Sequence, residues 1–146
     1  MKLTQTQIKN LLKLDVKGAG GKDALLAAAL GHERANERFY DATDPMGTPW
    51  EYKKQSKDQW LDLIKLSELG QKDRNIGILW FNHSGGKIHS VYLCTYGELM
   101  KTLGIGWLAL SVTRLFKKVC AVYRPQIKIS VKDTIIQQGT LLYSTE

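Results

Sequence analysis

The sequence predicts an α/β (α+β) fold in which a central mixed β-sheet is flanked by helices. Runs rich in aromatic and β-branched residues predict strands, and apolar stretches with helical spacing stand between them. Such interleaving favours helices packed on the faces of one sheet. The 146 residues, 43% of them hydrophobic, are enough for a single domain, residues 1–146, with one core.

Two helices are predicted near the N-terminus. Thr4 or Thr6 is a suitable cap for the first, which ends before the glycine-rich segment 18–21. Its apolar stripe consists of Ile8, Leu11 and Leu12. We expect this short helix, within residues 1–17, to offer a contact to a second subunit. The second helix is predicted from Lys22 to about Leu30, a stretch rich in alanine and leucine.

A hairpin is predicted between Phe39 and Lys53. Pro45 presets φ for the first corner of a type I turn, and Gly47 supplies the left-handed residue that closes a three-residue loop. This turn sets Thr48 opposite Asp44. By continuation of the same register, Glu51 lies opposite Asp41.

The elements after Lys53 are predicted from periodicity and from turn residues. A helix ending near Gly70 is expected from the apolar positions Trp60, Leu61, Leu63, Ile64 and Leu66. Strands are expected over Asn75–Phe81 and Lys87–Thr95, around a turn at His83–Gly86. A further helix is expected over Tyr96–Leu103.

The C-terminal region has a mixed pattern. Residues 108–123 are apolar and basic, and we expect some helix near 113–118 and a strand near 119–123. Ser130 with Asp133 resembles a capping box, Gly139 a helix stop, and Thr140–Ser144 a last strand.

The formal net charge of +7 predicts a polyanionic partner, and DNA or RNA is the commonest polyanion for a small domain.

Cys94 and Cys120 lie in segments that we expect to be buried, with the spacing of neither a zinc site nor a disulfide framework. They suit a reducing cytoplasm. No stretch approaches the roughly 20 apolar residues that cross a bilayer, so no membrane association is expected.

Asp41, Glu51 and Lys53 carry the strongest chemical signal. Strand alternation places these three side chains on one face and Asp44 on the other. Two converging carboxylates repel each other unless a divalent cation or a shared proton lies between them, and hard oxygen ligands suit Mg²⁺. Lys53 is then placed to orient a metal-held water, lower its pKa or stabilise transition-state charge. The pattern predicts phosphodiester hydrolysis; the alternative is an ordinary charged edge of an exposed strand.

These residues resemble the signature of the PD-(D/E)XK nucleases, in the form found in type II restriction endonucleases. Other segments occur in similar order and extend the resemblance over most of the chain from about residue 18. They are Gly20-Gly21-Lys22, Asp41-Ala42 with Asp44, Glu51 with Lys53, His89–Tyr92, Glu98-Leu99, Pro125 with Ile127, Val131-Lys132, Gly139-Thr140 and Tyr143.

The resemblance implies a restriction-endonuclease-like core and a Mg²⁺-dependent reaction on double-stranded DNA. By it, Asp41 and Glu51 hold the metal with the Tyr52 carbonyl, Lys53 attends the attacking water, and Glu37 is an accessory acidic residue. It also implies a homodimer on a palindromic site, in which each subunit cuts one strand to leave a 5′-phosphate.

The chain departs from that family pattern in two segments. A histidine run after the lysine is replaced by Gln55, Ser56 and Lys57, and an asparagine pair before the proline by Tyr123-Arg124. We therefore expect another target sequence, with Gln55 or Gln59 contacting adenine and Arg124 contacting guanine. The candidate DNA contacts are Lys54, Gln55, Ser56, Lys57, Gln59, Arg124 and Gln126, for which phosphate contacts are the alternative to base contacts.

Two other functions fit the same residues. One is a structure-selective DNA nuclease of the Holliday junction resolvase kind. The other is a DNA-binding protein without catalytic activity.

The N-terminal region is also shorter than in the family. The family's dimer contact therefore does not transfer directly to this chain.

Overall fold

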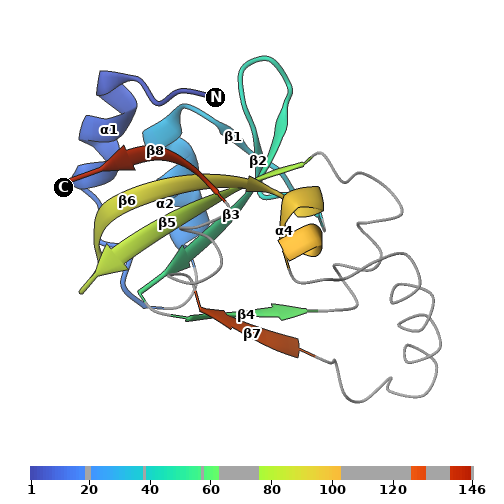
Figure 1. Ribbon diagram of the computed structural model, residues 1–146. Helices are drawn as coiled ribbons and strands as arrows, with labels where there is room; N and C mark the ends of the chain where they lie inside the picture. The colour runs from blue at the N-terminus through green and yellow to red at the C-terminus, as the bar shows by residue number, and fades with distance from the viewer. Residues whose placement is uncertain are drawn as a thin grey trace.

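The computed structural model describes residues 1–18, 21–37, 39–56, 58–62, 76–102, 126–130 and 139–145 (Figure 1). These segments form an α+β structure with a six-stranded mixed sheet and a separate two-stranded sheet. The helices are α1 (Gln5–Leu12), α2 (Lys22–Leu30) and α4 (Tyr96–Thr102). The large sheet contains β1 (Glu33–Arg34), β2 (Ala42–Thr43), β3 (Pro49–Gln55), β5 (Gly77–Ser84), β6 (Lys87–Thr95) and β8 (Thr140–Ser144). The small sheet pairs β4 (Asp58–Asp62) with β7 (Gln126–Ser130).

The large sheet has the strand order β1-β2-β3-β5-β6-β8 (Figure 1). The β3–β5 pair is parallel, and the other neighbouring strands are antiparallel. Thus β3, the strand of Glu51 and Lys53, is held between β2 and β5. The expected central mixed sheet with flanking helices is confirmed.

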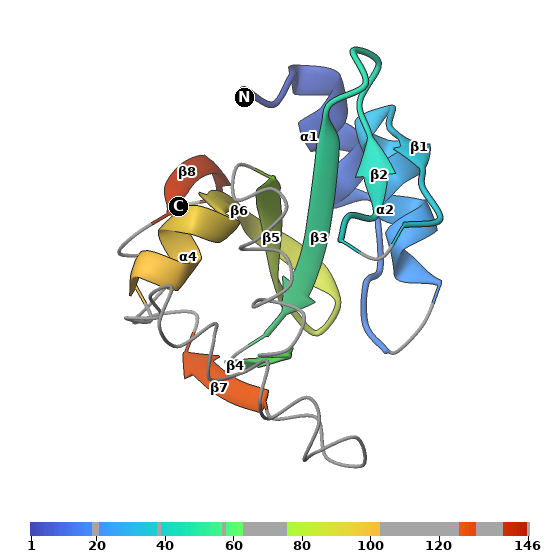
Figure 2. The same ribbon diagram turned by 90° about the vertical axis from the view of Figure 1, so that its right-hand side faces the viewer.

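Side chains on the two faces of the sheet have different partners. Figure 2 shows α2 on one side of β3 and α4 on the other, and α1 shares a core with α2 through Leu11 and Leu26. Tyr52 and Phe81 belong to the core shared with α1 and α2, while Glu51 and Trp80 alternate to the opposite face. That opposite face also buries Ile78, Cys94, Tyr96 and Leu99. Glu51 and Lys53 therefore lie on the sheet face away from the N-terminal helices.

The first helix begins at the predicted cap. Thr4 Oγ1 accepts a hydrogen bond from the Gln7 backbone N–H (3.1 Å), and Gln7 Oε1 accepts one from the Thr4 N–H (2.9 Å). This reciprocal capping box selects Thr4 over Thr6. Gln7 Nε2 also donates to the Leu30 carbonyl (2.9 Å), which ties α1 to the end of α2.

The predicted hairpin register is confirmed. Gly47, with φ of 83°, donates to the Asp44 carbonyl at 2.9 Å, and Ala42 pairs with Trp50. The pairing of β2 with β3 ends at Ala42, and the Asp41 N–H donates to the Trp50 carbonyl (2.8 Å), so the position of Asp41 opposite Glu51 stays a prediction. Asp44 accepts hydrogen bonds from the backbone N–H groups of Met46 (2.9 Å) and Thr48 (3.0 Å) and from Trp50 Nε1 (3.1 Å). Asp44 thus organises the turn and is not free to join Glu51.

The turn between β5 and β6 is tighter than predicted. Gly85 and Gly86 alone connect the strands, with φ of 59° and 93°, so His83 and Ser84 belong to β5. Consecutive positive φ values match the twist of the flanking strands. Tyr96–Thr102 and Thr140–Ser144 form the helix and the strand that were expected there.

The predicted helix beginning near Trp60 is wrong for the residues that the structure describes. Trp60 pairs with Lys128, and Leu61 with Ile127, in the β4–β7 ladder. Pairing with a distant segment overrides the short apolar pattern. The remainder of that helix at 63–70, the elements expected in 108–123, Cys120 and Asp133 lie outside the described residues; Ser130 ends β7.

Cys94 is a buried free thiol. Burial raises its pKa to about 12, so the group stays a neutral thiol in the core. Among the described segments, no helix combines the length and apolarity that a bilayer crossing requires.

Gly77 is expected to tolerate no side chain. It pairs with Trp50, and a Cβ there would lie 2.5 Å from Trp50 Cζ3 and 3.1 Å from Leu93 Cδ1. Gly77→Ala should therefore lower the free energy of unfolding by about 1–3 kcal/mol through overpacking. Urea denaturation measures this change, with Met46→Ala as a control because Met46 is 93% exposed. A Gly77→Ala protein as stable as the wild type would contradict the expectation.

Candidate active site

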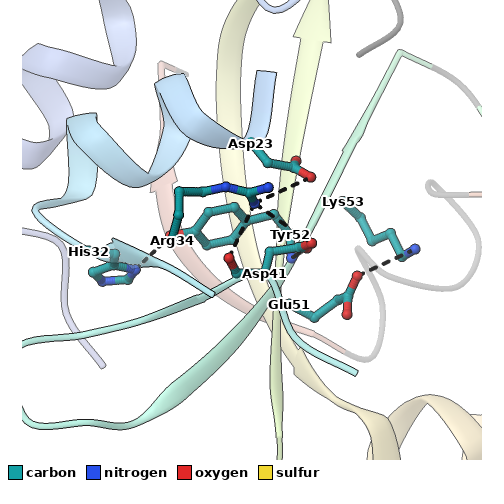
Figure 3. A network of polar contacts seen from close by, with 7 residues as sticks. All are labelled: Asp23, His32, Arg34, Asp41, Glu51, Tyr52 and Lys53. Carbon is teal, nitrogen blue, oxygen red and sulfur yellow. Dashed lines mark hydrogen bonds and ion pairs between the residues drawn. The ribbon is translucent and has the colours of Figure 1, made fainter. Parts of the chain in front are cut away.

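Glu51 and Lys53 form an ion pair on one face of β3. Lys53 Nζ lies 3.8 Å from Glu51 Oε1 (Figure 3). The Lys53 side chain is 22% exposed and the Glu51 side chain 5%. A carboxylate this deeply buried needs compensation, which Lys53 supplies in part. The predicted placement of both groups on one face is confirmed.

Asp41 is fixed against the backbone of β3. Its N–H donates to the Trp50 carbonyl (2.8 Å), and its Oδ2 accepts a hydrogen bond from the Tyr52 N–H (2.7 Å). Charge-assisted bonds of this length are strong and orient the carboxylate. Its second oxygen, Oδ1, lies 4.0 Å from Arg34 Nη1 (Figure 3).

Asp41 and Glu51 both act on the hydroxyl of Tyr96, the first residue of α4. Burial raises the pKa of Tyr96, and the negative charges of Glu51 and Asp41 raise it further. Sequence reasoning missed Tyr96, because the start of a helix carries no signal for the strand that it meets.

A third carboxylate stands near this cluster. Burial raises the pKa of Asp23, and the neighbouring Asp41 charge raises it further, while Arg34, Lys53 and Lys54 oppose these effects. Asp23 lies in the first turn of α2, and its Oδ2 is 3.8 Å from Arg34 Nη1. Figure 3 shows Asp23 and Asp41 on either side of that guanidinium. Helix periodicity gave no indication that Asp23 reaches the hairpin.

The donors are of the kind that Mg²⁺ uses. The described residues contain no group of three or more acidic, histidine or cysteine side chains arranged around a single ion. Mg²⁺ takes one or two protein carboxylates and keeps several waters. Asp41 Oδ1, the buried Glu51 carboxylate and the intervening Tyr52 carbonyl on β3 fit that requirement in number and chemistry.

Gln55, predicted as a DNA contact, belongs to a buried chain of polar groups. Gln55 Nε2 donates to Asn82 Oδ1 (2.9 Å), and Asn82 Nδ2 donates to Ser90 Oγ (3.0 Å). Their exposed fractions are 4%, 4% and 6%. The chain runs across β3, β5 and β6 and ties the end of the Glu51 strand to the rest of the sheet.

The other predicted site residues are dispersed. Lys54 Nζ donates to the Gly18 carbonyl (2.5 Å), and Ser56 is exposed. Gln59 and Gln126 lie on the facing strands β4 and β7. Glu37 is exposed. Lys57 and Arg124 lie outside the described residues.

A basic surface surrounds the loop of Asp15–Gly18. Its members are Lys17, Lys22, Lys54 and Lys87, which lie near the loop of Asp15–Gly18. Asp15 accepts a hydrogen bond from the Lys17 N–H (3.0 Å), which lowers its pKa, and the charges of Lys22 and Lys87 lower it further. Val16 N–H donates to the Gly86 carbonyl (2.9 Å) and fixes this loop on the β5–β6 turn.

No protein-family model matches this sequence, and no curated protein matches it significantly.

His32 supports β3 from the side of the N-terminal helices. Its Nδ1 and the Tyr52 hydroxyl are 2.7 Å apart, and its ring stacks with those of Trp50 and Tyr52. Burial lowers the pKa of His32 and raises that of Tyr52, whose hydroxyl therefore stays the donor to a neutral imidazole.

Stability should depend on pH through His32. Because its folded pKa lies below the ordinary 6.5, the unfolded chain binds a proton more readily, and stability falls as pH drops below that value. His32→Gln retains an acceptor for the Tyr52 hydroxyl and should remove part of this slope. Urea unfolding at about pH 7.5 and about pH 5.5 measures it. An unchanged slope in the variant would refute the assignment.

Proposed function

We propose that this protein is a Mg²⁺-dependent endonuclease with a restriction-endonuclease-like core that hydrolyses double-stranded DNA at a short palindromic site. The observation that carries the proposal is the juxtaposition on β3 of the Glu51–Lys53 ion pair (3.8 Å) with Asp41, held by the Tyr52 N–H (2.7 Å). Two carboxylates can hold a metal ion beside a phosphodiester, and an ammonium can stabilise the charge that develops there.

Each residue of the cluster has a different role in the proposed reaction. Asp41 Oδ1, Glu51 and the Tyr52 carbonyl would hold Mg²⁺, which polarises the phosphate and acidifies a bound water when present. Lys53 orients the attacking water and stabilises negative charge on the phosphorus centre. Water attacks phosphorus, the bond to the 3′ oxygen breaks, and the products are a 5′-phosphate and a 3′-hydroxyl. The Tyr52 N–H keeps Asp41 in place throughout.

Charge supports a nucleic acid as substrate. The net charge is +7, and Lys17, Lys22, Lys54 and Lys87 form a basic surface at the loop of Asp15–Gly18, from which the Lys54 charge reaches Asp23. Ammonium groups spaced along such a surface neutralise successive phosphates and release counterions. A homodimer is part of the proposal, because a palindromic duplex needs one such cluster for each strand.

The α1 surface is a candidate for the dimer contact. Met1 and Leu12 are 45% and 37% exposed there, and Ile8 is half-buried. A second copy covering this surface would remove these apolar groups from water. The proposal of a homodimer is tested by the mass in solution with and without duplex DNA.

Removing the cluster should abolish cleavage and preserve DNA binding. Asp41→Ala, Glu51→Gln and Lys53→Met should each lower the rate of plasmid cleavage in Mg²⁺ by about 10²- to 10³-fold or more, since each removes several kcal/mol of charge stabilisation. Asp41→Ala should bind DNA at least as tightly as the wild type, because a negative charge near the phosphate is lost. Glu33→Gln, at an exposed position on β1, is the matched control.

The DNA cleavage products distinguish the proposed function from the two alternatives. Discrete fragments of one sequenced plasmid, with run-off sequencing of the ends, would support a site-specific enzyme. Preferential cutting of branched DNA would instead support a junction resolvase. DNA binding without cleavage by the wild-type protein, unaffected by Asp41→Ala, would overturn the proposed enzyme.

A further inference from the structure

Arg34 faces the Asp41 carboxylate oxygen that the Tyr52 N–H does not bind. Since Asp41 Oδ2 is engaged by that N–H at 2.7 Å, Oδ1 is the oxygen left for a cation. Arg34 Nη1 lies 4.0 Å from this Oδ1 and 3.2 Å from the Asp41 carbonyl, to which it donates. A metal ion that binds Asp41 through Oδ1 therefore approaches an oxygen that Arg34 already faces (Figure 3).

The same nitrogen also faces Asp23. Asp23 Oδ2 is 3.8 Å from Arg34 Nη1, so a single guanidinium nitrogen lies between two carboxylates. Both separations exceed the 2.7–2.9 Å that is usual for a charge-assisted hydrogen bond. These ion pairs are loose and electrostatic, and a metal ion that binds oxygen at about 2.0–2.1 Å can displace them.

The Arg34 side chain can move away from Asp41 into solvent. It lies on β1, a two-residue edge strand, and its side chain is 46% exposed. Without a positive charge at this position, Asp23 and Asp41 would repel each other, as the effect of Asp41 on the pKa of Asp23 indicates. The guanidinium is thus placed to stabilise the pair until another cation replaces it.

We propose that Arg34 is a positioning residue that acts as an internal counter-ion: it holds Asp41 and Asp23 together in the metal-free protein and competes with Mg²⁺ for Asp41 Oδ1. This inference rests on the proposed Mg²⁺-dependent function. It requires that Mg²⁺ and the Arg34 charge weaken each other at Asp41, since coupling between two ligands of one group is reciprocal.

The test measures Mg²⁺ binding without DNA. The full chain is titrated with MgCl₂, and the Kd is obtained from the heat of binding and from the rise in Tm. The proteins compared are the wild type, Arg34→Met, Arg34→Gln and Arg34→Lys. The two neutral variants should bind Mg²⁺ about twofold to fivefold more tightly than the wild type, the range expected for a partly exposed ion pair. Arg34→Lys, which keeps the charge, should stay near the wild-type Kd.

A matched control separates local competition from net charge. Lys9→Met removes one positive charge from an exposed position on α1 and should leave the Kd unchanged. The metal-free Arg34→Met and Arg34→Gln proteins should also have a lower Tm than the wild type, and saturating Mg²⁺ should reduce that difference.

The outcomes are distinct. Neutral Arg34 variants with the wild-type Kd, or a weaker one, overturn the counter-ion role. If the wild type still cleaves DNA in that case, the proposed function stands and only this inference falls. Absence of Mg²⁺ binding in the wild type and in every variant overturns both proposals.

Discussion

The turn closed by Asp44 fixes the register of β3 against β2, and this register decides which side chains meet. Asp44 accepts bonds from two backbone N–H groups and from Trp50 Nε1, so the loop has one conformation. A slip of one residue would send Glu51 and Lys53 into the core occupied by Tyr52. The position of Asp41 follows from the same constraint, because its carboxylate is bound to the N–H of the strand that it faces.

Electrostatic compensation organises the surroundings of that hairpin. Asp23, Asp41 and Glu51 bring three negative charges together, and each has a cation or an N–H group within reach. Lys53 and Arg34 approach the cluster from different sides of β3 (Figure 3). A site so arranged is partly neutralised before any substrate arrives, which limits the destabilisation that converging carboxylates cause in a folded protein.

Features that depend on local chemistry were predictable from the sequence. The Thr4 cap, the Gly47 turn and the shared face of Glu51 and Lys53 each follow from residues close together in the chain. Features that depend on long-range packing were not. The β4 strand owes its conformation to β7, Asp23 meets Asp41 through the docking of α2, and Gln55 is buried by its bond to Asn82. Local patterns carry no information on such partners.

The parallel pairing of β3 with β5 has a consequence for how the molecule assembles. Parallel neighbours need a long connection, here residues 56–76. The chain loses conformational entropy when the ends of this connection come together, and this loss precedes the pairing of Trp50 with Gly77. The β2–β3 hairpin, by contrast, involves residues close in sequence and closes on the timescale of microseconds. We therefore expect the hairpin of Asp41 and Glu51 to form before the slower, non-local half of the sheet that carries Tyr96.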